Sequence, residues 1–101
     1  MPVSLRTIER ELRRRLEAAG RHDLATRALE RVGLTDDGST LYVHIFMRPD
    51  WEQYRPGDVY PLAFADYDQV ETLAQWRAFL REALLLLADD FPRIVRWLEG
   101  A

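Results

Sequence analysis

The segment TLYVHIFMR, residues 40–48, constrains the fold more than any other part of the chain. Its side chains alternate with the two-residue period of a β-strand, so the two faces of that strand can be read separately. One face is aliphatic and consists of Leu41, Val43, Ile45 and Met47. The other face is largely aromatic and consists of Tyr42, His44, Phe46 and Arg48. A surface strand of a small domain normally has one polar face, so we expect a helix or another chain to cover the aromatic side.

The first third of the chain predicts a helical hairpin over residues 4–33. Ser4 is a suitable N-cap for its first helix, over residues 4–19. Apolar residues recur there at helical spacing: Leu5, Ile8, Leu12, Leu16 and Ala19. After a short connection, a second helix is predicted over residues 24–32 and is expected to end at Gly33.

A β-hairpin is predicted over residues 40–65. Its second strand, residues 59–65, follows a tip loop at 49–58 that is bracketed by prolines. Pro61 has no backbone N–H to donate, so the second strand should lie at a sheet edge or contain a bulge. Three of its side chains are expected to share one face and to join the aromatic face of the first strand: Tyr60, Leu62 and Phe64.

The last third of the chain predicts a long helix followed by a short one. A capping-box pattern, Asp68 with Glu71, precedes the long helix over about 70–88. A second capping signal at Asp89 or Asp90, with Pro92 just after it, predicts that a short helix completes the chain.

Together these elements predict a single α+β domain over residues 1–101, in the order α-α-β-β-α-α. A two-stranded antiparallel hairpin packs against the helices of residues 4–33 and 68–99. Apolar residues make up 48% and charged residues 31% of the chain, which is typical of folded globular domains. No apolar run is long enough to cross a bilayer and no signal-peptide pattern is present, so we expect a cytoplasmic protein without a membrane partner.

No motif in the sequence predicts catalysis, a cofactor or a metal site. Cysteine is absent, which excludes thiol nucleophiles and thiolate ligands. The acidic cluster Asp66, Asp68 and Glu71 is explained by helix capping. His44 is the residue that keeps a chemical alternative open, namely a small-ligand site or an undetected enzyme active site between the sheet and the long helix, around His44 and Trp76.

The N-terminal helix carries a row of arginines opposite its apolar stripe: Arg6, Arg10, Arg13 and Arg14. Such a row can neutralise phosphates, so nucleic-acid binding is an alternative function. Two observations count against it. Glu9 and Glu11 stand four residues before Arg13 and Arg15, which is the favourable spacing for ordinary surface ion pairs, and the whole chain has a net charge of −3.

The favoured interpretation is a non-catalytic protein-interaction or regulatory module that acts as a small homodimer. Seven residues are expected to form the dimer contact or an internal layer: Tyr42, His44, Phe46, Tyr60, Phe64, Phe79 and Leu86. The tip loop is the expected contact for another protein, because tryptophan, tyrosine and arginine are the residues that most often anchor interfaces. Its four candidate residues are Arg48, Trp51, Tyr54 and Arg55.

Overall fold

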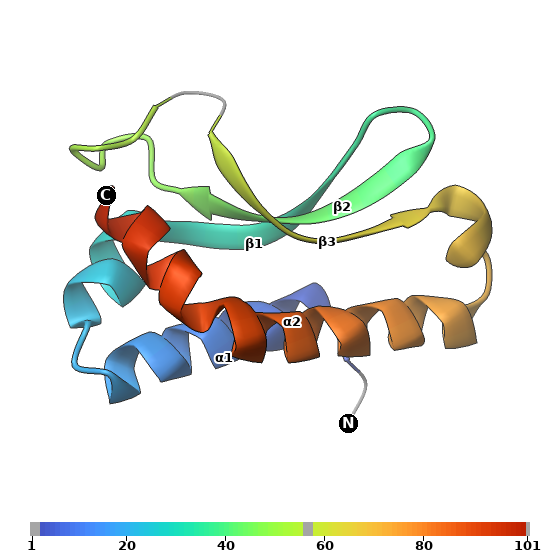
Figure 1. The fold of residues 1–101 in the computed structure, drawn as a ribbon, viewed down its shortest axis with the longest axis horizontal. Coiled ribbons are helices and arrows are strands. Elements are labelled where there is room, and N and C mark those ends of the chain that lie inside the picture. The colour runs from blue at the N-terminus through green and yellow to red at the C-terminus, as the bar shows by residue number, and fades with distance from the viewer. Residues whose placement is uncertain (1–2, 56–57, 101) are drawn as a thin grey trace.

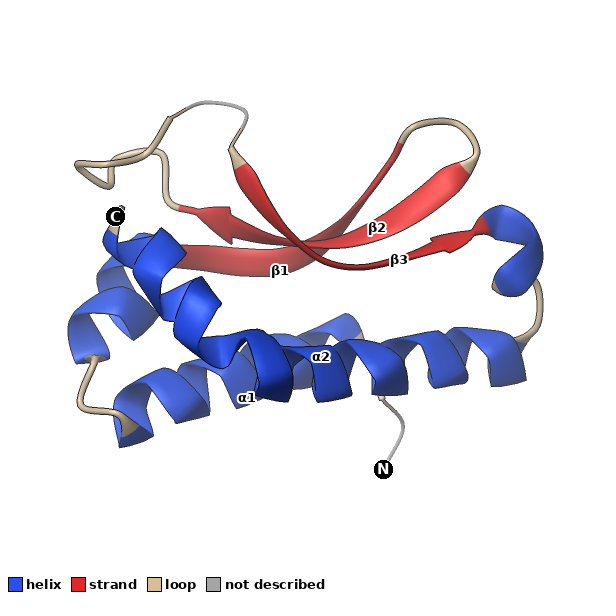
Figure 2. Ribbon diagram, viewed as in Figure 1, coloured by secondary structure: helices blue, strands red, loops and turns tan. Residues whose placement is uncertain are grey.

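Strand β2 (Thr40–Met47) is the centre of the structure (Figure 1). The computed structural model describes residues 3–55 and 58–100, and its strands form one antiparallel sheet in the order β1-β2-β3. The other elements, in chain order, are α1 (Leu5–Ala18), the π-helical turn η1 (Leu24–Ala28), β1 (Leu29–Asp36), β3 (Val59–Asp66), the 3₁₀ turn η2 (Tyr67–Gln69) and α2 (Leu73–Glu99). Figure 2 shows that α1 and α2 lie on the same side of the sheet. The architecture is therefore an α+β domain of two layers.

The aliphatic face of β2 forms the core, as the sequence predicted. Val43 and Ile45 are fully buried and Met47 is 4% exposed, while Leu41 packs against the core from the edge. They contact the stripe of α1, where Ile8, Leu12 and Leu16 are also fully buried. Helix α1 begins as predicted, because the Ser4 side chain accepts a hydrogen bond from the backbone N–H of Thr7 at 3.2 Å.

The predicted helix over residues 24–32 is wrong. Only η1 is helical there, and the chain then enters β1, so Gly33 lies within a strand and does not end a helix. The reason is a bulge between Leu29 and Arg31, where the pairing with β2 shifts register. The bulge places Leu29 and Val32, three residues apart, on the same buried side. That spacing imitates one turn of an amphipathic helix.

The sheet consequently has three strands where two were predicted, and the order α-α-β-β-α-α is replaced by one helix, three strands and one helix. The predicted hairpin of residues 40–65 is present as β2 and β3. Because β1 pairs along the other edge of β2, the central strand is hydrogen-bonded on both sides. An isolated two-stranded hairpin is only marginally stable in water, and the third strand stabilises it here without a second chain.

A second bulge lies in β3, at the position that Pro61 predicted. Strand β3 is an edge strand, and its register shifts so that Pro61 pairs with His44 while Ala63 pairs with Val43. Leu62, between them, is buried. The expectation that Tyr60, Leu62 and Phe64 share the aromatic face is therefore wrong. Tyr60 and Leu62 lie on the helix side, and Phe64 alone lies on the opposite side.

Helix α2 is a single helix of 27 residues, and the predicted separate short helix is its continuation. Its capping box is formed by Thr72 and Gln75, four residues later than the predicted box of Asp68 with Glu71. Pro92 lies inside the helix, which changes direction in its C-terminal part (Figure 1). Proline removes one backbone hydrogen bond and tilts the helix without ending it. The bend keeps both parts on the core, so that Leu87, Ile94 and Leu98 are all fully buried.

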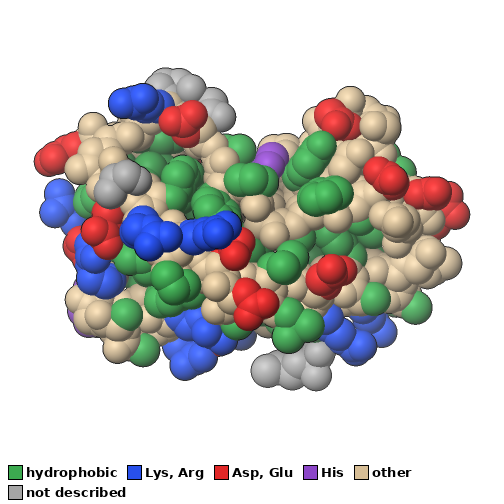
Figure 3. All heavy atoms as spheres, viewed as in Figure 1, with side chains coloured by type: hydrophobic (Ala, Val, Ile, Leu, Met, Phe, Trp, Pro, Cys, Tyr) green, Lys and Arg blue, Asp and Glu red, His purple; other side chains and the backbone are tan. Residues whose placement is uncertain are grey.

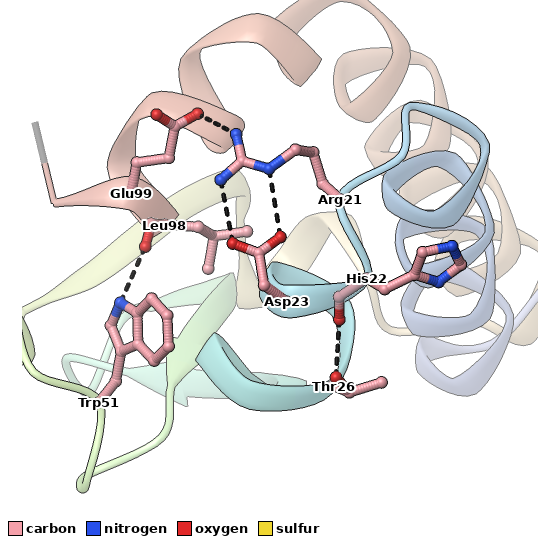
Figure 4. A network of polar contacts seen from close by, with 7 residues as sticks. All are labelled: Arg21, His22, Asp23, Thr26, Trp51, Leu98 and Glu99. Carbon is pink, nitrogen blue, oxygen red and sulfur yellow. Dashed lines mark hydrogen bonds and ion pairs between the residues drawn. The ribbon is translucent and has the colours of Figure 1, made fainter.

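The C-terminal end of α2 is fixed to two distant segments (Figure 4). Arg21 donates a hydrogen bond to Oε1 of Glu99 at 2.6 Å and also pairs with Asp23 at 3.2 Å. Trp51 donates its indole N–H to the carbonyl oxygen of Leu98 at 3.0 Å. The tip loop and the connection after α1 are thus both held by the last turns of α2.

We predict that Leu87→Ala lowers the free energy of unfolding by about 2–5 kcal/mol, because it removes a fully buried side chain and leaves a cavity. Leu85→Ala is the matched control, since Leu85 is on the same helix but is 69% exposed. It should change the free energy of unfolding by less than about 0.5 kcal/mol. Urea denaturation followed by circular dichroism measures both. Equal losses for the two variants would contradict the observed packing of α2.

Candidate functional site

One face of the sheet has no helix over it in the described part of the chain (Figure 2). We call this surface the open face. It is formed by side chains that alternate with the core residues on all three strands: Arg31, Thr35, Tyr42, His44, Phe46 and Phe64. Phe64 is 72% exposed, more than any other large apolar side chain in the described ranges. Phe64 adjoins further aromatic side chains on the same face, and a contiguous exposed apolar patch marks the open face as the candidate site.

Four rings run in a row across the open face. The centroids of Phe64 and Tyr42 are 6.2 Å apart, and those of Tyr42 and His44 are 5.4 Å apart with the rings nearly parallel, at 8°. His44 then meets Phe46 edge to face, with centroids 6.1 Å apart and planes at 85°. These distances lie in the range of favourable aromatic pairs. The row is therefore packed and offers a preformed apolar surface.

Arg31 closes the row at one end. Its guanidinium carbon lies 4.0 Å from the centroid of the Phe46 ring, which is a close cation–π contact. Gly33 makes this placement possible, because a Cβ at that position would lie 1.9 Å from Nη1 of Arg31 and 3.2 Å from the Phe46 ring. Gly33, which was predicted to end a helix, thus leaves space for the Arg31 side chain on the sheet.

Acidic side chains lie at the other end of the row, around the β1–β2 turn. Asp37 accepts hydrogen bonds from the backbone N–H groups of Ser39 and Thr40, and one from the Tyr42 hydroxyl at 3.0 Å. These contacts lower the pKa of Asp37 to about 2, so that carboxylate stays charged. Asp36 is also exposed, but it pairs opposite Leu41 and so lies on the helix side of the sheet. The open face therefore has a basic end at Arg31 and an acidic end at the turn.

His44 lies in the middle of the row and is half-buried. Its Nδ1 contacts the Thr35 hydroxyl, which donates to that nitrogen when the ring is neutral and carries its proton on Nε2. Burial lowers the pKa of His44 below its ordinary value of 6.5. The structure also corrects the predicted place of a ligand site. His44 faces away from α2, so it does not share a site with Trp76 between the sheet and the long helix.

The remaining expected contact residues lie on the helix side of the sheet. Tyr60 donates its hydroxyl to Asp90 at 2.9 Å, and its ring centroid is 5.9 Å from that of Trp97. Phe79 is 6% exposed within the core, and Leu86 is half-buried on α2. None of the three contributes to the open face, because the bulge in β3 turns Tyr60 inward and α2 lies on the other side of the sheet.

Within the tip loop, the candidate residues have different environments. Trp51 is half-buried, bonded to Leu98, and has the Arg27 guanidinium 5.7 Å from its ring centroid. It anchors the loop to α2 (Figure 4). Tyr54 is also half-buried and packs against the core, and Arg48 is partly buried below the loop. Arg55 is exposed.

Two of the four arginines expected to contact nucleic acid have structural partners. Arg13 donates to the backbone carbonyls of Ala25 and Glu30, and so joins α1 to the start of β1. It also pairs with Glu9, as its spacing predicted. Arg14 pairs with Glu11 at 2.6 Å, while Arg6 and Arg10 are exposed. The basic surface of α1 is thus partly neutralised by its own helix.

Arg31 and Thr35 are the residues of the open face that sequence reasoning missed. Both belong to β1, most of which was assigned to a helix and a turn. A usable signal was the Asp-Gly pair at 37–38, which lies between two stretches of alternating apolar residues and is typical of a β-hairpin turn. Read in that way, residues 32–35 pair with 42–45.

Other kinds of site have no counterpart in the ranges 3–55 and 58–100. Within them, no three histidine or acidic side chains come together as ligands for a metal ion. Asp66 has a structural role, because it caps η2 and accepts a hydrogen bond from the Thr40 hydroxyl at 3.0 Å. No helix in these ranges has the length and apolar character needed to cross a membrane.

We predict that acidification destabilises the protein through His44. Its pKa is lower in the folded than in the unfolded chain, so the unfolded state binds more protons and the free energy of unfolding falls as the pH drops below 6.5. The decline ends once the pH is below the folded pKa. Urea denaturation at about pH 7.5 and about pH 5 should show a smaller decline for His44→Gln than for the unaltered chain. His22→Gln, at an exposed position, is the control, and a decline unaffected by His44→Gln would contradict the prediction.

No protein-family model matches the chain, and no curated protein or solved structure shows significant similarity to it. What the open face binds is therefore inferred from its rings and charges alone.

Proposed function

We propose that this protein is a non-catalytic interaction module that pairs with a second copy of itself through the open face. The observation that carries the proposal is the uncovered row of rings from Phe64 to Phe46. Apolar area removed from water contributes about 25 cal/mol per Å². Aromatic side chains at the centre of a contact are also the usual anchors of binding energy.

Charge complementarity favours a second copy as the occupant. The open face carries Arg31 at one end and Asp37 at the other, with His44 between them. A two-fold axis near His44 brings the basic end of each copy against the acidic end of the other. The same patch then serves both partners, as an isologous contact requires.

The shape of the sheet agrees with this arrangement. The strands curve upward at both ends, toward the tip loop and toward the β1–β2 turn (Figure 1). Figure 3 shows the corresponding notch between two lobes of the molecular surface. Two sheets that pack face to face can keep their strand directions within about 30° of each other. In that geometry, the raised tip-loop end of one copy meets the raised β1–β2 turn of the other.

Pairing through the open face leaves the exposed end of the tip loop free for a further protein partner. Arg55 is exposed there, beside half-buried Tyr54. We therefore assign the regulatory role to the dimer, because it presents two tip loops to a further partner. Nucleic acid is the less favoured occupant of the open face, because Asp37 would repel phosphates.

We predict that the unaltered chain has twice its 11.9 kDa mass in solution and that Phe64→Glu shifts it toward monomer. A buried, unpaired carboxylate at the contact should weaken dimerisation by at least about tenfold. Analytical ultracentrifugation over a concentration series measures this. Leu85→Glu is the matched control, since Leu85 and Phe64 are 69% and 72% exposed.

Three results would contradict the proposal. One is an unaltered chain that stays monomeric at high micromolar concentration. Another is a dimer that Leu85→Glu disrupts while Phe64→Glu does not, because this would place the contact on α2. The third is a monomer that binds single-stranded RNA through Phe64, because this would make the open face a base-stacking surface.

We further predict that exchanging charges restores a weakened dimer. Arg31→Glu and Asp37→Arg should each weaken pairing, because each places like charges opposite one another across the two-fold axis. The double variant should recover most of the loss, which sedimentation equilibrium reports as a coupling between the two positions. Independent, additive effects of the two substitutions would mean that these residues do not face each other.

A further inference from the structure

A cavity of about 390 Å³ lies between η1 and the tip loop. It is lined by Thr26, Arg27, Arg48, Asp50 and Trp51, none of which belongs to the open face. The cavity therefore has no part in the proposed pairing and needs a separate explanation.

Arg48 is the unusual residue of this cavity. Its backbone is fixed, because its N–H donates to the carbonyl oxygen of Ala28 at 2.8 Å and its carbonyl accepts from the N–H of Trp51 at 3.1 Å. Its Nε is fully buried and has no hydrogen-bond acceptor among the described residues. A buried donor on a charged group is costly to leave unpaired. The position of Arg48 is thus set by the fold, while its charge lacks a partner.

Arg27 adds a second positive charge. It lies against the Trp51 ring and, like Arg48, has no ion-pair partner in the described ranges. Asp50 supplies the cavity's single carboxylate. Thr26 cannot donate to a ligand, because its hydroxyl already donates to the His22 carbonyl at 2.6 Å (Figure 4). Two guanidinium groups and one carboxylate leave an excess of one positive charge beside an aromatic wall.

We propose that this cavity binds a small organic carboxylate. Its two oxygens accept charge-assisted hydrogen bonds from the guanidinium groups of Arg27 and Arg48. A single negative charge offsets the excess positive charge of the cavity. The apolar part of the ligand lies against Trp51, and a body of that kind fills a volume that a bare inorganic anion would leave largely empty.

Benzoate is the probe, titrated at constant ionic strength and followed by the indole N–H resonances in NMR spectra. The Trp51 resonance should shift and saturate, and acetate should bind more weakly because it lacks an apolar body to contact the ring. Arg48→Gln should reduce benzoate affinity by at least about tenfold, since it removes charged hydrogen bonds. Asp50→Asn should increase the affinity, because it removes the one repelling carboxylate. That increase is not expected if these residues serve structure alone.

Arg6→Gln is the control, because Arg6 is exposed on α1 and should leave binding unchanged. Urea denaturation of each variant separates loss of binding from loss of fold. Absence of a shift at millimolar benzoate would overturn the proposal, as would equal binding by Arg48→Gln that remains folded. Preference for inorganic phosphate over benzoate would overturn the assignment to a carboxylate. Sedimentation of Arg48→Gln should still show the dimer, so failure here is distinguishable from failure of pairing.

Discussion

The structure depends on the burial of one face of β2. Val43 and Ile45 have no exposed area, and both helices lie on their side of the sheet. The described residues supply one helical layer, and it lies on that side alone. The aromatic side of the same strand is therefore left uncovered by the residues that the structure describes. The core and the candidate site are two consequences of a single strand with two apolar faces.

Two bulges decide which side chains reach each face. The bulge in β1 turns Leu29 and Val32 toward the core and leaves Arg31 outside. The bulge in β3 turns Tyr60 inward and leaves Phe64 outside. Bulged edge strands, one of them carrying a proline, are also poor templates for adding another strand. This favours contact through the face of the sheet over contact through its edges.

The sequence predicted the structure correctly where a pattern was compatible with only one kind of element. The alternation in β2, the cap at Ser4 and the edge position of Pro61 were predicted from elementary rules and are present. Strand β1 was missed because its bulge imitates helical spacing. The length of α2 was missed because Asp89, Asp90 and Pro92 resemble a helix start, although burial of Ile94 and Leu98 keeps the helix continuous.

The same physics explains the mixed outcome at the open face. Tyr42, His44 and Phe46 were grouped correctly because strand alternation is local. Tyr60 was misplaced, since a bulge is a property of strand pairing that one strand's sequence does not show. Arg31 was missed along with its strand. The sequence did not predict how the strands pair with one another. That pairing, with its bulges, decides on which face of the sheet each side chain lies.

The hydrogen bond from Arg21 to Glu99 joins residues 78 positions apart in the chain. During synthesis, the sheet leaves the ribosome before the helix that completes its core, and only α1 is then available to cover Val43 and Ile45. Contacts that close such long loops form slowly. We therefore expect a stage of the nascent chain in which the aromatic face of β2 is uncovered and its aliphatic face is covered by α1 alone, and that stage is the one most exposed to misassociation and to chaperone capture.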